Sequence, residues 1–135
     1  MAIEITENLS GPVTVLGLKG RITLGEGTAR FRNRIALVLD NAKWFKERWG
    51  WSLCLILDMG GVEFVDSAGL GALVGAFASA RHQEARIKLV NLTQLLREQL
   101  IITKISTVFE IYNSVEEAKA SCGAAPVATE TEKSV

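Results

Sequence analysis

Residues 53–71 of this chain read LCLILDMGGVEFVDSAGLG, and this stretch decides the fold. Its first five residues are apolar, and the apolar run ends at Asp58. A short, continuous apolar run of this kind is typical of a strand that is covered on both faces in a parallel sheet. The glycine-containing residues 59–65 are expected to form a loop, after which Ser67 begins a helix with one apolar stripe: Leu70, Leu73, Val74 and Phe77. The stretch therefore predicts a central strand, a loop and a helix that packs on the sheet.

The residues before this stretch predict a hairpin and one long helix. Ile3 and Ile5 alternate with polar neighbours, and after a turn at Gly11 and Pro12 residues 13–18, which are rich in β-branched side chains, predict a second strand. After a glycine-rich connection, Thr28 is expected to cap the longest helix of the chain, whose apolar residues follow steps of four and three: Phe31, Ile35, Val38, Ala42 and Phe45. Three tryptophans are expected to close the corner between this helix and the next strand rather than to form a binding cage: Trp44, Trp49 and Trp51.

The residues after the stretch continue the alternation of strands and helices. Residues 87–90 predict a strand, and Asn91 with Gln94 resembles a capping pair for a helix with an apolar face: Leu92, Leu95, Leu96 and Leu100. Residues 108–112 predict the last strand, and Ser114 with Glu117 forms a capping box for a short helix that ends near Ser121. The order predicts an α/β domain over residues 1–120, with a mixed, largely parallel central sheet of about five strands and flanking helices. Residues 121–135 lack an apolar period and are expected to be a disordered tail.

Composition excludes several classes of protein. The chain has 135 residues and a formal net charge of zero, which disfavours bulk electrostatic binding of nucleic acid. No apolar run approaches the roughly 20 residues of a membrane span, and residues 1–8 lack the features of a signal peptide, so we expect a cytoplasmic protein. The two cysteines, Cys54 in the apolar run and Cys122 in the predicted tail, lack metal-ligand spacing. We expect a buried filler residue and a free thiol that do not meet.

The chemically informative residues lie at the predicted start of the second helix. Asp66 or Ser67 is placed to accept a hydrogen bond from an unpaired backbone N–H of the first turn. Gly69 and Gly71 each cost about 1 kcal/mol of helix propensity relative to alanine, which suggests that another surface approaches closely. A serine hydroxyl at such a helix N-terminus is accessible to a protein kinase, and phosphorylation there would add about −1.5 to −2 charge.

The run from Val62 to Gly71, preceded by residues 55–58, resembles the STAS domain family and, within it, the single-domain anti-sigma factor antagonists of bacteria. The resemblance covers the element order from about Ile3 to Ala120. It implies a regulatory binding protein of signal transduction and stress-response transcription, not an enzyme, with no cofactor and no metal. It also implies that Ser67 is phosphorylated. The implied partners are a GHKL-type serine kinase that doubles as an anti-sigma factor and a PPM-type phosphatase.

The resemblance assigns roles to further residues. Asp58 would give structural support, and the partner-binding face would comprise Asp66, Ser67, Ala68, Gly69, Leu70 and Gly71, together with Arg21 and Thr23 of the preceding loop. Many family members carry an acidic Gly-Glu-Leu-Asp type run at that loop, whereas this chain has Gly-Arg-Ile-Thr at residues 20–23. Arg21 is either a partner for a phosphate on Ser67 or a solvated loop arginine. The oligomeric state, the cognate sigma factor and the physiological signal stay open.

Other functions remain as alternatives. A stand-alone STAS domain also serves as a scaffold or as an accessory subunit of a transporter. The glycines after the central strand invite a small nucleotide-binding enzyme, but their spacing is one residue too long and the next strand ends in Asn91. Asp58, Glu63 and Asp66 are more simply solvated or capping carboxylates than a metal cluster. His82, the only histidine, lies roughly four helical turns from Ser67, which excludes a catalytic triad.

Overall fold

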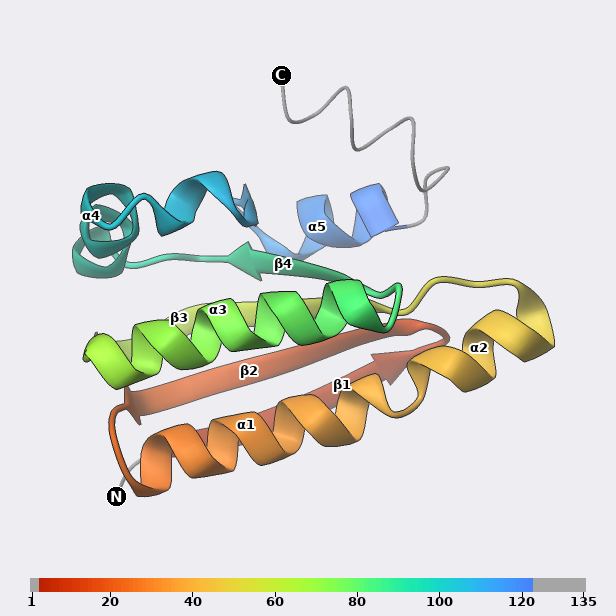
Figure 1. Cartoon of the computed structure of the whole chain (residues 1–135). Helices are drawn as coiled ribbons and strands as arrows, with labels where there is room; N and C mark the ends of the chain where they lie inside the picture. The colour runs from red at the N-terminus through yellow and green to blue at the C-terminus, as the bar shows by residue number, and fades with distance from the viewer. Residues whose placement is uncertain (1–2, 123–135) are drawn as a thin grey trace.

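The structure is a computed structural model that describes residues 3–122, and its strands form one five-stranded mixed sheet (Figure 1). The strands follow one another across the sheet in chain order: β1 (Ile3–Ser10), β2 (Val13–Ile22), β3 (Cys54–Val65), β4 (Arg86–Val90) and β5 (Glu110–Tyr112). β1 and β2 are antiparallel, and every other pair is parallel. The predicted fold class is therefore confirmed.

Helices cover both faces of this sheet. The elements are α1 (Glu26–Leu39), α2 (Ala42–Trp49), α3 (Ser67–His82), α4 (Gln94–Ile102), α5 (Val115–Cys122) and a short 3-10 helix, η1 (Ile105–Thr107). α1 and α3 lie side by side on one face and share the larger apolar core (Figure 1). A smaller apolar cluster forms where α5 packs on the opposite face. Within residues 3–122 no helix is long and apolar enough to span a bilayer.

β3 is the central strand, as predicted. Leu55, Ile56 and Leu57 are fully buried because β2 and β4 flank them and helices cover both faces. The prediction of a loop over residues 59–65 is wrong, since β3 continues to Val65 and pairs there with β2 alone through two register shifts. Gly61 makes this pairing possible, because a Cβ at this position would meet the carbonyl oxygen of Leu18 at 2.9 Å.

The single long helix predicted from Thr28 is also wrong. The chain turns at Asp40 and Asn41, two residue types that favour caps and turns, so α1 and α2 are separate helices and α3 is the longest. Thr28 lies inside α1, whose N-cap is Gly25 with φ 104°, a conformation that a side chain would strain. Thr28 still contributes, since its N–H donates to the carbonyl oxygen of Thr23 at 3.0 Å.

The predicted capping pair Asn91 and Gln94 is wrong, because Thr93 caps α4 with its hydroxyl, which accepts the N–H of Leu96 at 3.2 Å. The capping serine predicted for the last helix is confirmed: the Ser114 hydroxyl accepts the N–H of Glu117 at 3.1 Å.

The ends of the C-terminal elements also differ from the prediction. β5 is shorter than the predicted strand and comprises Glu110–Tyr112 only. α5 extends to Cys122, so the first two residues of the predicted tail are helical. The rest of that tail, residues 123–135, lies outside the described residues.

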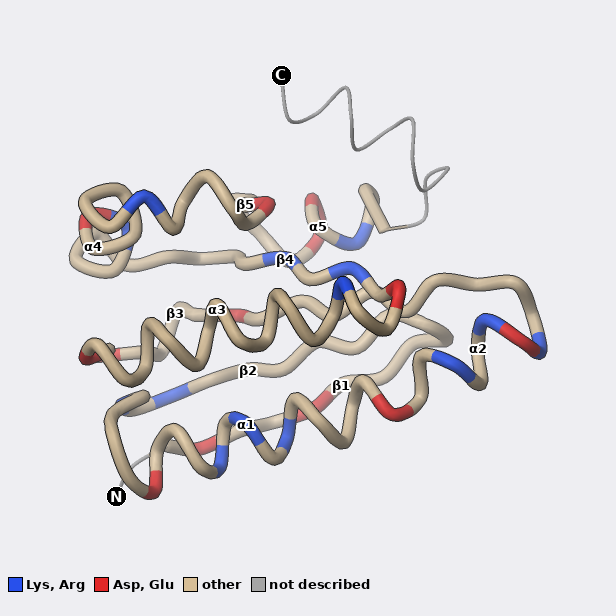
Figure 2. The backbone as a smooth tube through the Cα atoms, viewed as in Figure 1, with Lys and Arg blue, Asp and Glu red and all other residues tan. Residues whose placement is uncertain are grey.

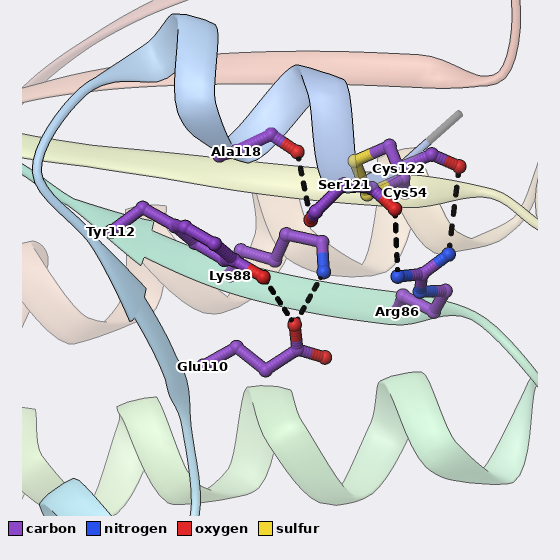
Figure 3. Close-up of a disulfide and its surroundings, with 8 residues drawn as sticks. All are labelled: Cys54, Arg86, Lys88, Glu110, Tyr112, Ala118, Ser121 and Cys122. Carbon is purple, nitrogen blue, oxygen red and sulfur yellow. Dashed lines mark hydrogen bonds and ion pairs between the residues drawn. A yellow bond between two sulfur atoms is a disulfide. The ribbon is translucent and has the colours of Figure 1, made fainter. Parts of the chain in front are cut away.

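The prediction that the cysteines do not meet is wrong. Cys54 and Cys122 form a disulfide, with their Cα atoms 6.0 Å apart (Figure 3). The physical reason is the packing of α5, whose last residue lies over the first residue of β3. Sequence spacing could not show this contact because 68 positions separate the two residues.

The tryptophans lie at the connection between α2 and β3, as predicted, but on its surface. Trp44, Trp49 and Trp51 are 53%, 50% and 44% exposed. Their rings pack on one another and on Phe45, and the Arg48 guanidinium lies over two of them. The three tryptophans therefore close the corner mainly through contacts with one another and with Phe45, which in turn packs against the core.

Candidate functional site

Asp66 caps α3 and fixes its first turn. Its backbone is extended, with φ −90° and ψ −174°, and its Oδ1 accepts the N–H of Gly69 at 2.8 Å. Its carbonyl oxygen accepts the N–H of Leu70 at 2.9 Å, which is the first hydrogen bond of the helix. Of the two predicted capping residues, Asp66 is therefore the cap.

The second carboxylate oxygen of Asp66 holds the loop between β2 and α1. Oδ2 accepts the backbone N–H of Leu24 at 3.0 Å. This hydrogen bond and the one from Gly69 hold the pKa of the Asp66 carboxyl below its usual value. The ionised carboxylate thus joins the start of α3 to a loop that precedes it by 42 positions.

Ser67 is the first residue of α3, and its side chain is exposed. Among residues 3–122 its hydroxyl has no hydrogen-bond partner. The adjacent helix N-terminus carries unpaired N–H groups and the positive end of the helix dipole, which favour a negative group at this position. The geometry can therefore accept a phosphate on Ser67 without disturbing the helix.

The two glycines of the motif have different surroundings. A Cβ on Gly69 would clash with the carbonyl oxygen of Ile22 and with Val65, so this glycine lets the end of β2 approach α3. A Cβ on Gly71 would meet nothing within 4 Å. The surface that approaches Gly69 is thus the chain's own backbone, which leaves no room there for the pyrophosphate of a dinucleotide.

The surface that α3 itself contributes after Ser67 is uncharged and partly apolar. α3 carries no charged residue from Ser67 to Ala80, in contrast to α1 and α2 (Figure 2). Three apolar side chains near the motif reach solvent: Leu24 (79% exposed), Phe64 (44%) and Val74 (38%). Such a face can dock a partner without desolvating a charge of its own.

The other predicted site residues lie on β2, in the loop after it and in the first turn of α3. Arg21 is exposed on β2 opposite Phe64 and has no ion pair with a described residue. Thr23 lies in the loop that Asp66 holds, where its carbonyl accepts the N–H of Thr28. Ala68 and Leu70 are half-buried in the first turn of α3.

Asp58 stands apart from the motif. It precedes Asp66 by eight positions, between β2 and β4, where its Oδ1 accepts hydrogen bonds at 3.1 Å from the N–H of Gly60 and from the side-chain amide of Asn91. This geometry joins the middle of β3 to the residue that follows β4 and does not bring Asp58 to Ser67.

Two contributors to the site carry no sequence signal. One is the backbone N–H of Leu24, and the other is the side chain of Gln99 on α4, whose Nε2 donates to the carbonyl oxygen of Val65 at 2.9 Å. Only knowledge of how β2, β3 and α4 pack could have revealed either one. Gln99 thereby fixes the backbone that leads into Asp66.

The side chains that a catalytic triad or a metal site would need do not lie close together in the described residues. His82 is the last residue of α3 and Ser67 is its first, so the two lie at opposite ends of a sixteen-residue helix. In the part of the chain that the structure describes, no three His, Cys, Asp or Glu side chains are placed to hold a metal ion.

The fold and the motif at the start of α3 define a STAS domain. Residues 3–118 match the model of this family, so the chain belongs to the STAS domain family. Over 61 residues it is 38% identical to the anti-sigma-B factor antagonist of Listeria monocytogenes, and equally so to that of Listeria innocua. The matched segment makes up 45% of this chain and 54% of the relative, so the chain spans about half the length of these relatives.

Solved structures share the fold. An anti-sigma factor antagonist from Mycobacterium paratuberculosis superposes with a TM-score of 0.72 at 18% identity, covering 91% of this chain and 96% of the other. The Bacillus cell fate determinant SpoIIAA in its phosphorylated form superposes with a TM-score of 0.61 at 18% identity, covering 88% of this chain and 97% of the other.

Proposed function

We propose that this protein is a cytoplasmic anti-sigma factor antagonist that switches partners through phosphorylation of Ser67. The observation that carries the proposal is the exposed Ser67 hydroxyl at the N-terminus of α3. Asp66 fixes this N-terminus by accepting hydrogen bonds from Gly69 in the first turn and from Leu24 in the loop before α1. The names of the Listeria relatives support the regulatory role. The protein would act by binding rather than by catalysis, with a GHKL-type serine kinase as anti-sigma factor and a PPM-type phosphatase as the reversing enzyme.

The switch would operate by adding charge at the start of α3, a helix that carries no charged residue from Ser67 to Ala80. In the unphosphorylated state the partner would contact the first turn of α3 together with the exposed Leu24 and Phe64. A phosphate on Ser67 adds about −1.5 to −2 charge, which an apolar or acidic partner surface disfavours. The helix N-terminus stabilises the same phosphate, so the domain stays folded while its binding changes.

Arg21 is the residue that would tune this switch. It is exposed on the strand next to Phe64, with no described ion pair to occupy it. In the phosphorylated protein its guanidinium would either reach the phosphate or stay solvated. ³¹P NMR of the phosphorylated wild type and of phosphorylated Arg21→Gln distinguishes these outcomes. If Arg21 contacts the phosphate directly, the substitution should shift the phosphate resonance and the pKa of the phosphate; if Arg21 is solvated, both should stay the same.

The first experiment maps phosphate in the cell. Intact mass spectrometry with site mapping, on protein purified from its native cells in growth and under stress, should find one phosphate, on Ser67. The unmodified protein then serves as bait for a kinase of the GHKL class. Absence of phosphate under all conditions would instead favour a scaffold or a transporter-accessory role.

Binding of the recovered kinase tests the charge mechanism. Ser67→Ala should bind like the wild type, whereas Ser67→Asp should weaken binding about tenfold or more, which corresponds to about 1.4 kcal/mol. Ser79→Asp is the matched control, because it adds the same charge to another exposed serine of α3. Equal affinity of wild type and Ser67→Asp would contradict the mechanism.

A further inference from the structure

We infer that Cys122 is a site of reversible exchange with small thiols, that Cys54 is its resolving partner, and that their disulfide latches α5 onto the sheet. Cys54 begins β3, whereas Ser67 follows the other end of that strand. The inference therefore rests on a different part of the molecule from the proposed function, and it shares with that proposal only the cytoplasmic location.

The two cysteines differ in access. Cys54 is 1% exposed in the cluster beneath α5, whereas Cys122 is partly exposed at the last position of that helix. Thiol exchange requires a thiolate to approach a sulfur directly. An external thiol can therefore attack Sγ of Cys122 but cannot reach Sγ of Cys54 in the closed structure.

A low-molecular-weight thiol can reduce the disulfide in two exchange steps. Its thiolate forms a bond to Sγ of Cys122 as the Cys54–Cys122 bond breaks, and the Cys54 thiolate that leaves takes a proton from water. A second thiolate then attacks the sulfur of the bound small thiol and releases Cys122 as a thiolate. Two small thiols are oxidised to their disulfide and the protein gains two thiols; the same small disulfide drives the reverse reaction.

Arg86 favours this chemistry at Cys122. Its guanidinium donates to the carbonyl oxygens of Ser121 at 3.1 Å and of Cys122 at 3.5 Å, so a positive charge stands at the end of α5 (Figure 3). A neighbouring arginine stabilises a thiolate, which offsets the negative end of the helix dipole. Arg86 is also the register partner of Cys54 on the neighbouring strand, so the cation lies near both cysteines, and it is their different access to solvent that decides which sulfur an external thiol attacks.

The disulfide is a large part of what holds α5 in place. The cluster under α5 has only four buried apolar members: Cys54, Ile56, Val90 and Ala118. From α5, Ala118 is buried in this cluster and the half-buried Val115 packs against it, so apart from Cys122 the helix buries little apolar area. An eight-residue helix is not stable by itself in water.

Reduction should therefore open α5 locally and leave the larger core intact. The face that becomes accessible includes Ile56 and Val90, whereas the core between the sheet and α1 and α3 is a separate cluster. Disulfides inside a reducing cytoplasm are rare and are characteristically redox-sensing. The disulfide at one end of β3 would thus respond to the thiol–disulfide balance of the cell, while Ser67 at the other end would respond to its kinase.

The first test traps the intermediate on the full chain. Oxidised wild-type protein is incubated with reduced glutathione without denaturant, quenched with acid, and mapped by mass spectrometry. We expect a transient glutathione adduct on Cys122, and an adduct on the same residue that persists when Cys54→Ser is treated with oxidised glutathione. A first adduct on Cys54, or a disulfide that native glutathione never opens, would overturn the exchange site.

The second test follows α5 by hydrogen exchange. Reduction of the wild type should speed exchange of the α5 amides by on the order of tenfold, while those of Leu55 and Leu57 keep their protection. The double variant Cys54→Ser/Cys122→Ser should match the reduced protein. If either reduced protein or double variant exchanges like the oxidised protein, the disulfide is not a latch.

Discussion

The carboxylate of Asp66 accepts the backbone N–H of Leu24 at 3.0 Å and that of Gly69 at 2.8 Å. One side chain therefore sets both the first turn of α3 and the loop that enters α1. Because Ser67 lies between Asp66 and Gly69, the position of its hydroxyl depends on this carboxylate. Leu24, the most exposed of the apolar residues near the motif, is held by the same bond.

Replacing Asp66 by Asn should loosen this arrangement. The amide keeps one acceptor but loses the charge, so amide exchange should accelerate at Leu24 and Gly69, and the midpoint of thermal unfolding should fall. The pKa of Asp66 is lowered in the folded protein from the ordinary 3.8, mainly by the bond from Leu24. A lowered pKa contributes stability above the unfolded value and loses it as pH falls through the folded value.

The difference in unfolding free energy between wild type and Asp66→Asn should therefore be largest above about pH 4 and shrink in more acidic solution. Glu63→Gln is the control, since it removes the same charge from an exposed position three residues away. A pH dependence that is the same for both variants would show that the hydrogen bonds of Asp66 do not cause the effect.

Gly69 and Gly71 should respond in opposite directions to alanine. Gly69→Ala places a Cβ against the carbonyl of Ile22 and should destabilise the fold by about 1–3 kcal/mol, the usual cost of overpacking. Gly71→Ala projects into open space and should stabilise α3 by about 0.5–1 kcal/mol. Chemical denaturation measures both, and equal effects would contradict the close approach of β2 to α3.

Gln99 should act on the site from α4. In Gln99→Met the side chain keeps its length but cannot donate to the Val65 carbonyl, which should cost about 1 kcal/mol and speed amide exchange around Asp66. Gln94→Met is the control, because Gln94 donates only to the exposed Glu98 on its own helix. Exchange around Asp66 that responds equally to both substitutions would rule out a positioning role for Gln99.

The parts of this structure that the sequence predicted are those that local pattern determines. The apolar run at residues 53–57 predicted the central strand because burial on both faces needs apolar side chains at every position. A cap at Asp66 or Ser67 was predicted from a short acceptor in front of an apolar stripe, and the structure identifies it as Asp66. Ser114 was predicted for the same reason.

The parts that escaped prediction depend on contacts between distant segments. β3 extends past Asp58 because ten residues of β2 offer a partner, which no feature of residues 59–65 reveals. The bond between Leu24 and Asp66 and the disulfide between Cys54 and Cys122 require the register of the sheet and the placement of α5. The break at Asp40 carried a local signal in its polar turn residues, but the apolar period across it concealed the turn.

The ion pair between the buried Lys88 and the partly exposed Glu110 leads to the last prediction. Lys88 is fully buried, and its Nζ donates to Oε1 of Glu110 at 2.6 Å; the Tyr112 hydroxyl donates to the same oxygen at 2.9 Å (Figure 3). Glu110→Ala takes the carboxylate away from a cation that water does not reach. The free energy of unfolding should fall by about 3 kcal/mol or more, whereas Glu116→Ala, an exposed change of the same kind on α5, should have little effect.

Tyr112 supplies a direct readout, because it is the only tyrosine of the chain. Burial raises the pKa of its hydroxyl above the ordinary 10.0, and the hydrogen bond and charge of Glu110 raise it further. A raised pKa stabilises the fold below about pH 10 and ceases to do so as pH rises through the folded value. Glu110→Ala should therefore lower the pKa of Tyr112 in an ultraviolet titration and reduce the loss of stability in alkali. An unchanged titration in Glu110→Ala would show that Glu110 does not raise the pKa of Tyr112, and that its carboxylate interacts chiefly with Lys88.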